Sequence, residues 1–335
     1  MNNWSPWVRA YTNIAFIKYW GKANEELMIP QNNSLSLTLD AFYTETRVKW
    51  SHEFTQDELI LDGKIQDAKS VKKTQKILNY IRSQAQIDSY ARIESKNFVP
   101  TAAGLASSAS GLAALAGAAS LAANLNLSRT ELSSLARLGS GSACRSIYGG
   151  FVEWEKGHDH FSSHAVPIDA ADWDLAMIFI IVRSQPKEIS STLGMQRAVS
   201  TSPYYDGWLS STEKDLEQMK KAIKDRDFKQ MGEIAESSAL KMHALNFSSR
   251  PPFNYWSPES IEAMNLVKVL RQKGFSAYFT MDAGPNVKVI CPASQMDEIY
   301  AFLSQEMPKA ELIKALPGPG MKIFDHSGLW VDYHE

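Results

Sequence analysis

Apolar side chains recur at helical spacing in several stretches of the chain. In residues 68–84 four of them fall on one face of a helix, between charged residues: Val71, Ile77, Leu78 and Ile81. Residues 107–124 carry leucines at the same spacing with alanines between them. Alanine is the best helix former, and both stretches are therefore predicted to be helices.

Shorter runs that are apolar, or that alternate between apolar and polar residues, predict strands. They cover residues 14–20, 34–39, 44–50, 58–63, 90–98, 149–155 and 174–182. The last of these runs is apolar enough to be a buried strand. Two further strands are predicted within residues 275–292, joined by a turn at Asp282-Ala283-Gly284-Pro285-Asn286.

Capping signals mark two further helices. Residues 128–139 begin at Ser128 with Glu131 three positions on, which is the spacing of a capping box. Residues 257–274 begin with a Ser-Pro dipeptide and end on a glycine, the usual start and stop of a helix.

The second half also predicts one long charged helix over residues 211–243 and a last helix over 294–307. Helices and strands are mixed without a strict βαβ repeat, so an α+β fold is expected in each half. The length of 335 residues favours two domains. A long polar, Ser-rich segment begins near residue 183, and it divides the chain into domains 1–183 and 184–335.

Composition narrows the class of protein. With 44% hydrophobic and 21% charged residues and a net charge of −2, the chain is typical of a soluble globular protein, not of one that binds nucleic acid or anionic membranes. Cys144 and Cys291 are too few for a disulfide framework. His158, His160 and His164 lack partners at zinc spacing. No signal peptide is recognised, so a cytoplasmic location is expected.

The segment Pro100–Gly111, "PTAAGLASSASG", consists almost entirely of small residues and enters the alanine-rich helix. The first turn of a helix has unpaired N–H groups and a positive dipole end. Gly104 lets the backbone approach an anion, and Ser107, Ser108 and Ser110 add hydroxyls. The segment alone is equally consistent with a phosphate cradle and with a Ser-capped helix packed through its alanines.

Polar and charged side chains also interrupt apolar or glycine-rich segments. They are Asn13, Lys18 and Lys22 near the N-terminus, Ser140, Ser142 and Arg145 within "RLGSGSACRSIYGGF", and Asp282 in the turn described above. Each one alone also fits an ordinary surface or turn position. Together they supply cations, a phosphate cradle and one acid, which is typical of phosphoryl transfer to an anionic substrate.

Six segments resemble signatures of one family, in the family's order. The helix-entry loop resembles the phosphate loop of the GHMP small-molecule kinases, and the more specific match is to the diphosphomevalonate decarboxylase branch. The matching segments are "NIAFIKYWGK", "PQNNSLSLTL", "PTAAGLASSASG", "GSGSACRSIYGGFVEW", "KEISSTLGM" and "TMDAGPNV". The resemblance implies a two-domain GHMP kinase-like fold with the active site in the cleft between the domains.

The resemblance also implies a reaction: mevalonate 5-diphosphate and ATP, with Mg²⁺, give isopentenyl diphosphate, ADP, phosphate and CO₂. Asp282 would orient or deprotonate the C3 hydroxyl, and Arg145, helped by Asn13, would hold the carboxylate. Lys18 would add positive charge between the phosphates. Several GHMP kinases carry an acid in the middle segment, whereas "SGSACRS" has an arginine there, which supports the decarboxylase branch.

The remaining site residues are assigned by the same resemblance. The 5-diphosphate would bind Tyr19, Lys22, Ser140, Ser142, Ser191 and the backbone near Met195. The ATP phosphates would lie against Gly104, Leu105, Ala106, Ser107 and Ser108, with Ser95 and Asn97 nearby on the nucleotide side. Lys187 would reach the γ-phosphate from a lid over residues 184–198, and Ser107 or Ser108 would reach Mg²⁺.

Two alternatives remain open from the sequence. A kinase of the same superfamily would stop after phosphorylating its substrate, and a non-catalytic anion- or nucleotide-binding module would keep only the fold. The resemblance also favours a homodimer.

Overall fold

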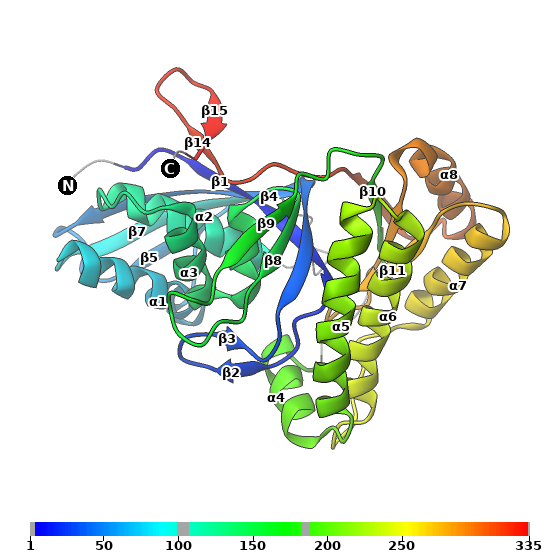
Figure 1. The fold of residues 1–335 in the computed structure, drawn as a ribbon. Helices are drawn as coiled ribbons and strands as arrows, with labels where there is room; N and C mark the ends of the chain where they lie inside the picture. Colours follow the sequence, from blue (N-terminus) through cyan, green and yellow to red (C-terminus); the bar gives the residue numbers. More distant parts are fainter. Residues whose placement is uncertain (1–3, 99–106, 183–187, 334–335) are drawn as a thin grey trace.

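Two β-sheets and the helices packed on them organise the fold (Figure 1). The computed structural model describes residues 4–98, 107–182 and 188–333. Within these ranges nine strands form the larger sheet: β1 (Val8–Ile17), β4 (Ser34–Ser51), β5 (Glu58–Leu61), β6 (Lys64–Ile65), β7 (Tyr90–Phe98), β8 (Phe151–Trp154), β9 (Ala165–Asp169), β14 (Lys322–Phe324) and β15 (Trp330–Asp332). Its order is β15-β14-β1-β4-β7-β5-β6, and β8 pairs with β4 and β9.

Helices α1 (Ala68–Ala85), α2 (Ser107–Ala122) and α3 (Arg129–Gly139) pack together on the larger sheet, as Figure 1 shows. Alanines and leucines of α2 are buried there beside Val48 and Trp50 of β4. A 3₁₀ helix, Gly141–Ile147, follows α3 and leads into β8. A short hairpin of β2 (Lys22–Asn24) and β3 (Ile29–Pro30) follows β1.

The smaller sheet has the order β11-β12-β10-β13. Its strands are β10 (Ala176–Ile181), β11 (Tyr278–Met281), β12 (Val287–Cys291) and β13 (Glu311–Ala315). Alternate residues of β10 enter two cores, one with α5 (Tyr205–Lys224) and α6 (Phe228–Phe247), the other with α7 (Pro258–Gln272) and α8 (Met296–Glu306). A short 3₁₀ turn, Ala293–Gln295, precedes α8.

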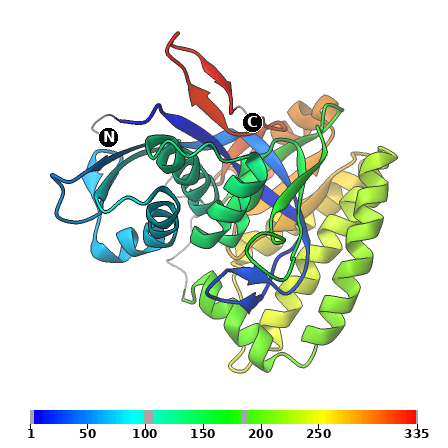
Figure 2. The same cartoon turned by 60° about the vertical axis from the view of Figure 1, so that its left-hand side comes forward.

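The two sheets share a core. Residues of β1 and β4, among them Phe16 and Leu37, pack in one cluster with Phe179 of β10 and with α5 and α6. β10 lies in the smaller sheet, whereas β14 and β15 near the C-terminus lie in the larger one and project as a hairpin in Figures 1 and 2. The division into 1–183 and 184–335 stays a prediction.

The α+β class and most predicted elements are confirmed, with two corrections. The long helix predicted over 211–243 is wrong, because the chain turns between α5 and α6. Arg226 adopts the left-handed conformation at φ 56°, and Asp227 caps α6 by accepting a hydrogen bond from the N–H of Gln230. Neither glycine nor proline marks this turn, so its local sequence resembles a continuing helix.

The second correction concerns the polar segment that begins near residue 183. It contains α4 (Ser191–Thr201). Ser190 caps this helix, because its side chain accepts a hydrogen bond from the N–H of Leu193. Met195 and Ala198 bury one face of this helix. Figure 2 shows α4 beside the β2–β3 hairpin, to which Gln196 is joined by a hydrogen bond to Glu25 of 2.6 Å.

The capping box at the start of α3 gives a stability prediction. Ser128 accepts a hydrogen bond from the N–H of Glu131, whose carboxylate accepts one from the N–H of Ser128. We expect Ser128→Ala to lower the free energy of unfolding by about 1 kcal/mol, because an N–H of the first turn loses its partner. Urea unfolding measures this loss. Ser83→Ala, at an exposed position on α1, is the matched control and should cost nothing.

Candidate active site

A cleft with a volume of about 630 Å³ opens where the larger sheet, α4 and the β11–β12 turn meet. It brings together eleven of the residues assigned to the site from the sequence: Asn13, Lys18, Tyr19, Lys22, Ser108, Ser140, Ser142, Arg145, Ser191, Met195 and Asp282. These residues come from distant parts of the chain. The cleft between the two halves is therefore where the described candidates converge.

One acid lies in the cleft between two buried lysines. Asp282 follows β11, and its Oδ1 accepts a hydrogen bond of 2.8 Å from Nζ of Lys18, which lies just after β1. Its Oδ2 lies 3.0 Å from Nζ of Lys288 on β12. The lysine side chains are 2% and 4% exposed, whereas Asp282 is 36% exposed. The acid therefore faces the cleft with both ammonium groups behind it.

This arrangement shifts several pKa values. Burial opposes ionisation of Asp282, but the ammonium groups of Lys18 and Lys288 hold its pKa well below the usual range. Burial lowers the pKa of Lys18 to about 8, although Asp282 opposes this shift. Burial, assisted by the two lysines, lowers the pKa of nearby His243 to about 3, so this imidazole is neutral. At neutral pH the centre is a carboxylate with two cations.

Arg145 forms a second buried cation site, on the 3₁₀ helix after α3. Its guanidinium donates hydrogen bonds to Ser34 at 2.7 Å, to Ser36 at 2.9 Å and to the amide oxygen of Asn13 at 3.2 Å. Asn13 in turn donates to Ser146 at 2.8 Å. Because all these partners are neutral, the positive charge of Arg145 is not cancelled and is available to an anion in the cleft.

The segment after β1 needs a glycine to bring its side chains to the cleft. Gly21 adopts φ 126°, and a Cβ there would lie 2.0 Å from the hydroxyl of Tyr205 on α5. That hydroxyl donates a hydrogen bond of 2.7 Å to the carbonyl of Trp20. The "KYWGK" segment is thus packed against α5, with Lys18 and Lys22 on either side of this contact.

Polar groups of the predicted diphosphate site lie along another wall of the cleft. The hydroxyl of Tyr19 is enclosed and has no hydrogen-bond partner in the described part of the chain. Lys22 is half-buried, and burial lowers its pKa. Ser140 and Ser142 flank Gly141, where a Cβ would lie 2.5 Å from Trp154, so only glycine fits between the serines. This wall can donate several hydrogen bonds to an anion.

Two helix N-termini also reach the cleft. Ser191 and Thr192 occupy the first turn of α4, and Met195 lies one turn further on. Ser107 begins α2, and the next residue, Ser108, is exposed at the cleft. The first turns of helices favour anions. The remainder of α2 is packed through buried alanines, as the packed-helix interpretation expects, and the phosphate cradle stays a prediction.

Four predicted site residues, Gly104, Leu105, Ala106 and Lys187, lie outside the described residues. Ser95 and Asn97 lie on β7, and their hydrogen bonds join neighbouring strands. The hydroxyl of Ser95 is 2.7 Å from that of Thr46, and Oδ1 of Asn97 accepts from Thr44 at 2.9 Å. Their role toward the nucleotide stays a prediction.

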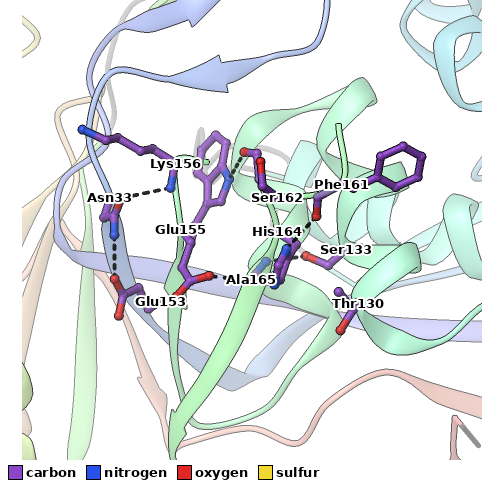
Figure 3. Close-up of polar contacts among 12 residues, drawn as sticks. Asn33, Thr130, Ser133, Glu153, Glu155, Lys156, Phe161, Ser162, His164 and Ala165 are labelled. Carbon is purple, nitrogen blue, oxygen red and sulfur yellow. Dashed lines mark hydrogen bonds and ion pairs between the residues drawn. The ribbon is translucent and has the colours of Figure 1, made fainter. Parts of the chain in front are cut away.

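The histidines of the segment 158–164 lie in the β8–β9 connection, and Figure 3 shows the partners of one of them, His164. Nδ1 of His164 is 2.9 Å from the carbonyl of Phe161, and its Nε2 is 3.8 Å from the carboxylate of Glu155. Within the described ranges no group of His, Cys, Asp and Glu side chains could hold a metal ion. Likewise, none of the described helices is both long and apolar enough to span a membrane.

Sequence reasoning missed four polar residues that the structure places at the site. Lys288 and Lys73 line the cleft, and Ser34 and Ser36 hold Arg145. Three of these had a local signal. A lysine inside the apolar strand "VKVIC" needs a buried partner, and the serines alternate with leucines in "SLSL". Lys73 lies on the polar face of α1 and had none.

Comparisons with known proteins agree with this geometry. Residues 10–165 match a family model described as diphosphomevalonate decarboxylase-like N-terminal domain. Residues 177–321 match the mevalonate 5-diphosphate decarboxylase C-terminal domain. The diphosphomevalonate decarboxylase of Candida albicans is 37% identical over 318 residues, which cover 90% of this chain and 88% of that protein.

Solved structures are similar over nearly the whole chain. The mevalonate diphosphate decarboxylase from Enterococcus faecalis is 52% identical with a TM-score of 0.91, covering 96% of this chain and 100% of that one. A structure described as MDDEF in complex with MVAPP, AMPPCP and magnesium is also 52% identical, with a TM-score of 0.92 and the same coverage. The fold is therefore the two-domain, GHMP kinase-like one. The two family models together span most of this sequence, and the chain belongs to the diphosphomevalonate decarboxylase family.

Proposed function

We propose that this chain catalyses the ATP-dependent decarboxylation of mevalonate 5-diphosphate to isopentenyl diphosphate, with release of ADP, phosphate and CO₂. One observation carries the proposal beyond family membership. Among the described residues that line the cleft, five are basic and one is a carboxylate, in a chain whose net charge is −2. Such a cleft suits a substrate with a diphosphate and a carboxylate, together with a nucleoside triphosphate.

The residue roles follow from the chemistry of each wall. Arg145 binds the substrate carboxylate, and Asn13 orients the guanidinium. Tyr19, Lys22, Ser140 and Ser142 bind the 5-diphosphate, with Ser191 and the backbone near Met195 at the start of α4.

Asp282 accepts a hydrogen bond from the C3 hydroxyl and aims its oxygen at the γ-phosphate, and Lys18 adds positive charge beside it. The hydroxyl oxygen bonds to the γ-phosphorus as the bond to ADP breaks, and the hydroxyl proton passes to Asp282. The resulting phosphate ester is a better leaving group. When that phosphate departs with its bonding electrons, positive charge develops at C3. The carboxylate then leaves as CO₂, and its C–C bonding pair forms the double bond. The fixed dipoles and charges of the cleft stabilise these changes without reorganising.

ATP and Mg²⁺ fit the donors on the α2 side of the cleft. Mg²⁺ retains water and binds substrate phosphates through few protein ligands, which agrees with the lack of an acidic cluster in the described residues. The hydroxyl of Ser107 or Ser108 would reach the ion, and Gly104, Leu105 and Ala106 would line the phosphates. When bound, Mg²⁺ neutralises charge on the transferring phosphate. Lys187, Ser95 and Asn97 keep their predicted roles toward the nucleotide.

Incubation with ATP, Mg²⁺ and mevalonate 5-diphosphate labelled at C1 tests the function. We expect one labelled CO₂ and one ADP for each isopentenyl diphosphate formed. ADP and a phosphorylated product without CO₂ would identify a kinase instead. Binding of both ligands without any product would identify a non-catalytic module. The homodimer, which the family resemblance favours, and the cytoplasmic location, which was expected from the N-terminal sequence, also remain proposals.

Ser108 tests the nucleotide side of the cleft separately. Because this side chain is exposed at the cleft on the first turn of α2, Ser108→Leu places bulk where the ATP phosphates would lie. We expect the KM for ATP to rise by about tenfold or more, equivalent to one lost charge-assisted hydrogen bond. The Kd of mevalonate 5-diphosphate should change little. Ala122→Leu, at the other end of α2, is the control. An unchanged KM for ATP would mean that this segment is a packed helix start and does not bind the phosphates.

A further inference from the structure

Lys288 is a buried charge in an otherwise apolar strand. β12 reads Val-Lys-Val-Ile-Cys, and all five of its residues are buried. Taking an ammonium ion out of water costs several kcal/mol unless an opposite charge and hydrogen bonds compensate for it. Nζ of Lys288 has two such partners, Oδ2 of Asp282 at 3.0 Å and the carbonyl of Asn286 at 3.3 Å.

The contacts of Asp282 show what this lysine does. Lys18 holds Oδ1 and Lys288 holds Oδ2, so the carboxylate cannot rotate about its Cβ–Cγ bond without breaking an ion pair. Lys18 is fixed in turn, because its Nζ also donates to the carbonyl of Ala15 at 2.7 Å. The two ammonium groups reach the acid from different strands, one at the end of β1 and the other on β12.

We propose that Lys288 is a positioning residue, which holds the Asp282 carboxylate in one orientation beside Lys18 and thereby fixes where the reacting hydroxyl meets the acid. The role of Lys288 in turnover rests on the function proposed above. The ion pairs of Asp282 with Lys18 and Lys288 do not depend on that function. Lys288 lies behind the acid and acts through it.

The proposal also predicts a change in the pH dependence of turnover. The charged or titratable groups around Asp282 are Lys18, Lys288, Arg145 and His243. Lys288 lowers the pKa of both Asp282 and Lys18. Removing its charge therefore raises both pKa values. If turnover needs protonated Lys18, the alkaline limb of the profile should move to higher pH, whereas the pKa of Asp282 lies too low to set the acid limb.

The test compares Lys288→Met, which keeps the stem without the charge, with Lys288→Arg, which keeps the charge. For Lys288→Met we expect kcat to fall by about 10- to 100-fold, as for a misplaced catalytic group. The KM for mevalonate 5-diphosphate should change by less than about threefold, and the alkaline limb should shift to higher pH. Lys288→Arg should leave the limbs at their wild-type positions. Lys314→Met removes a lysine of β13 that pairs with Asp297 on α8, and it should change neither kcat nor the pH profile.

A kcat within twofold of wild type, or an unshifted alkaline limb, in a Lys288→Met enzyme that is folded by circular dichroism would overturn the proposal. If that variant does not fold, Lys288→Gln takes its place with the same expectations. An NMR spectrum of protein labelled with ¹³Cε-lysine needs no substrate. In Asp282→Asn the Lys288 resonance should move, because its ammonium loses the ion pair at 3.0 Å; an unmoved resonance would overturn the proposal even if the enzyme acted on another substrate.

Discussion

Replacement of Asp282 by alanine is expected to lower kcat by about 10²–10⁴-fold, the range for loss of a catalytic acid–base group. Both substrates should still bind. Asp282 is the only carboxylate among the described residues that line the cleft. Its two ion pairs hold the carboxylate at the cleft, which agrees with the role proposed for it beside the reacting hydroxyl. In the proposed roles the anionic parts of the substrate bind other walls, so their affinity should survive.

The measurement is steady-state turnover combined with calorimetric titration of mevalonate 5-diphosphate. Asp282→Asn is the stricter variant, since it keeps the shape of the side chain and removes only the charge. Asp297→Ala is the matched control, because this exposed acid also pairs with a lysine, Lys314, away from the cleft. Near-normal kcat in both Asp282 variants would remove this residue from the chemistry.

Replacement of Arg145 by lysine is expected to lower kcat/KM for mevalonate 5-diphosphate by about 30- to 4,000-fold. This range corresponds to the 2–5 kcal/mol or so that truncation of one partner in a buried charge pair typically costs. The guanidinium is 2% exposed and is held by Ser34, Ser36 and Asn13. A lysine keeps the charge, but it lacks the planar fork that can hold these oxygens and a carboxylate together.

The control is Arg129→Lys, on α3 outside the cleft, where the arginine donates to the carbonyl of Tyr333 at 2.9 Å. The effect at Arg145 should disappear for a substrate analogue without the C1 carboxylate, whose affinity should be the same for the wild type and the variant. If Arg145→Lys weakened the analogue as much as the substrate, the arginine would not be the carboxylate ligand.

Local sequence was enough for most of the secondary structure. The caps at Ser128 and Ser257 predicted two helix starts that the structure confirms, because each cap satisfies N–H groups only three residues away. The break near Arg226 was not predicted, because the contacts that stabilise it come from residues far away in the sequence. The ion pairs of Arg226 with Asp169 and Asp172 stabilise that turn from a distant strand and its connection.

Part of the candidate site could also be predicted from the sequence. The family resemblance grouped Asp282, Arg145 and Lys18 in one site, because it carries information about which distant residues meet. Lys288 belonged to the matched segment's continuation but had no assigned role. Only the distance of 3.0 Å to Asp282 shows that its charge is part of the centre. Ser34 and Ser36 were likewise read as ordinary strand residues.

The sequence by itself determined the family, the α+β class, and the helices and strands whose caps and periodicities are complete within a few residues. Tertiary structure alone decided that β10 joins the smaller sheet and that β14 and β15 join the larger one. It also decided the turn between α5 and α6 and the ionisation of Asp282. The physical reason is range. A cap or an apolar face depends on neighbours three or four positions away, whereas the ionisation of Asp282 depends on Lys18, 264 positions earlier in the chain, and on the burial that folding creates around both.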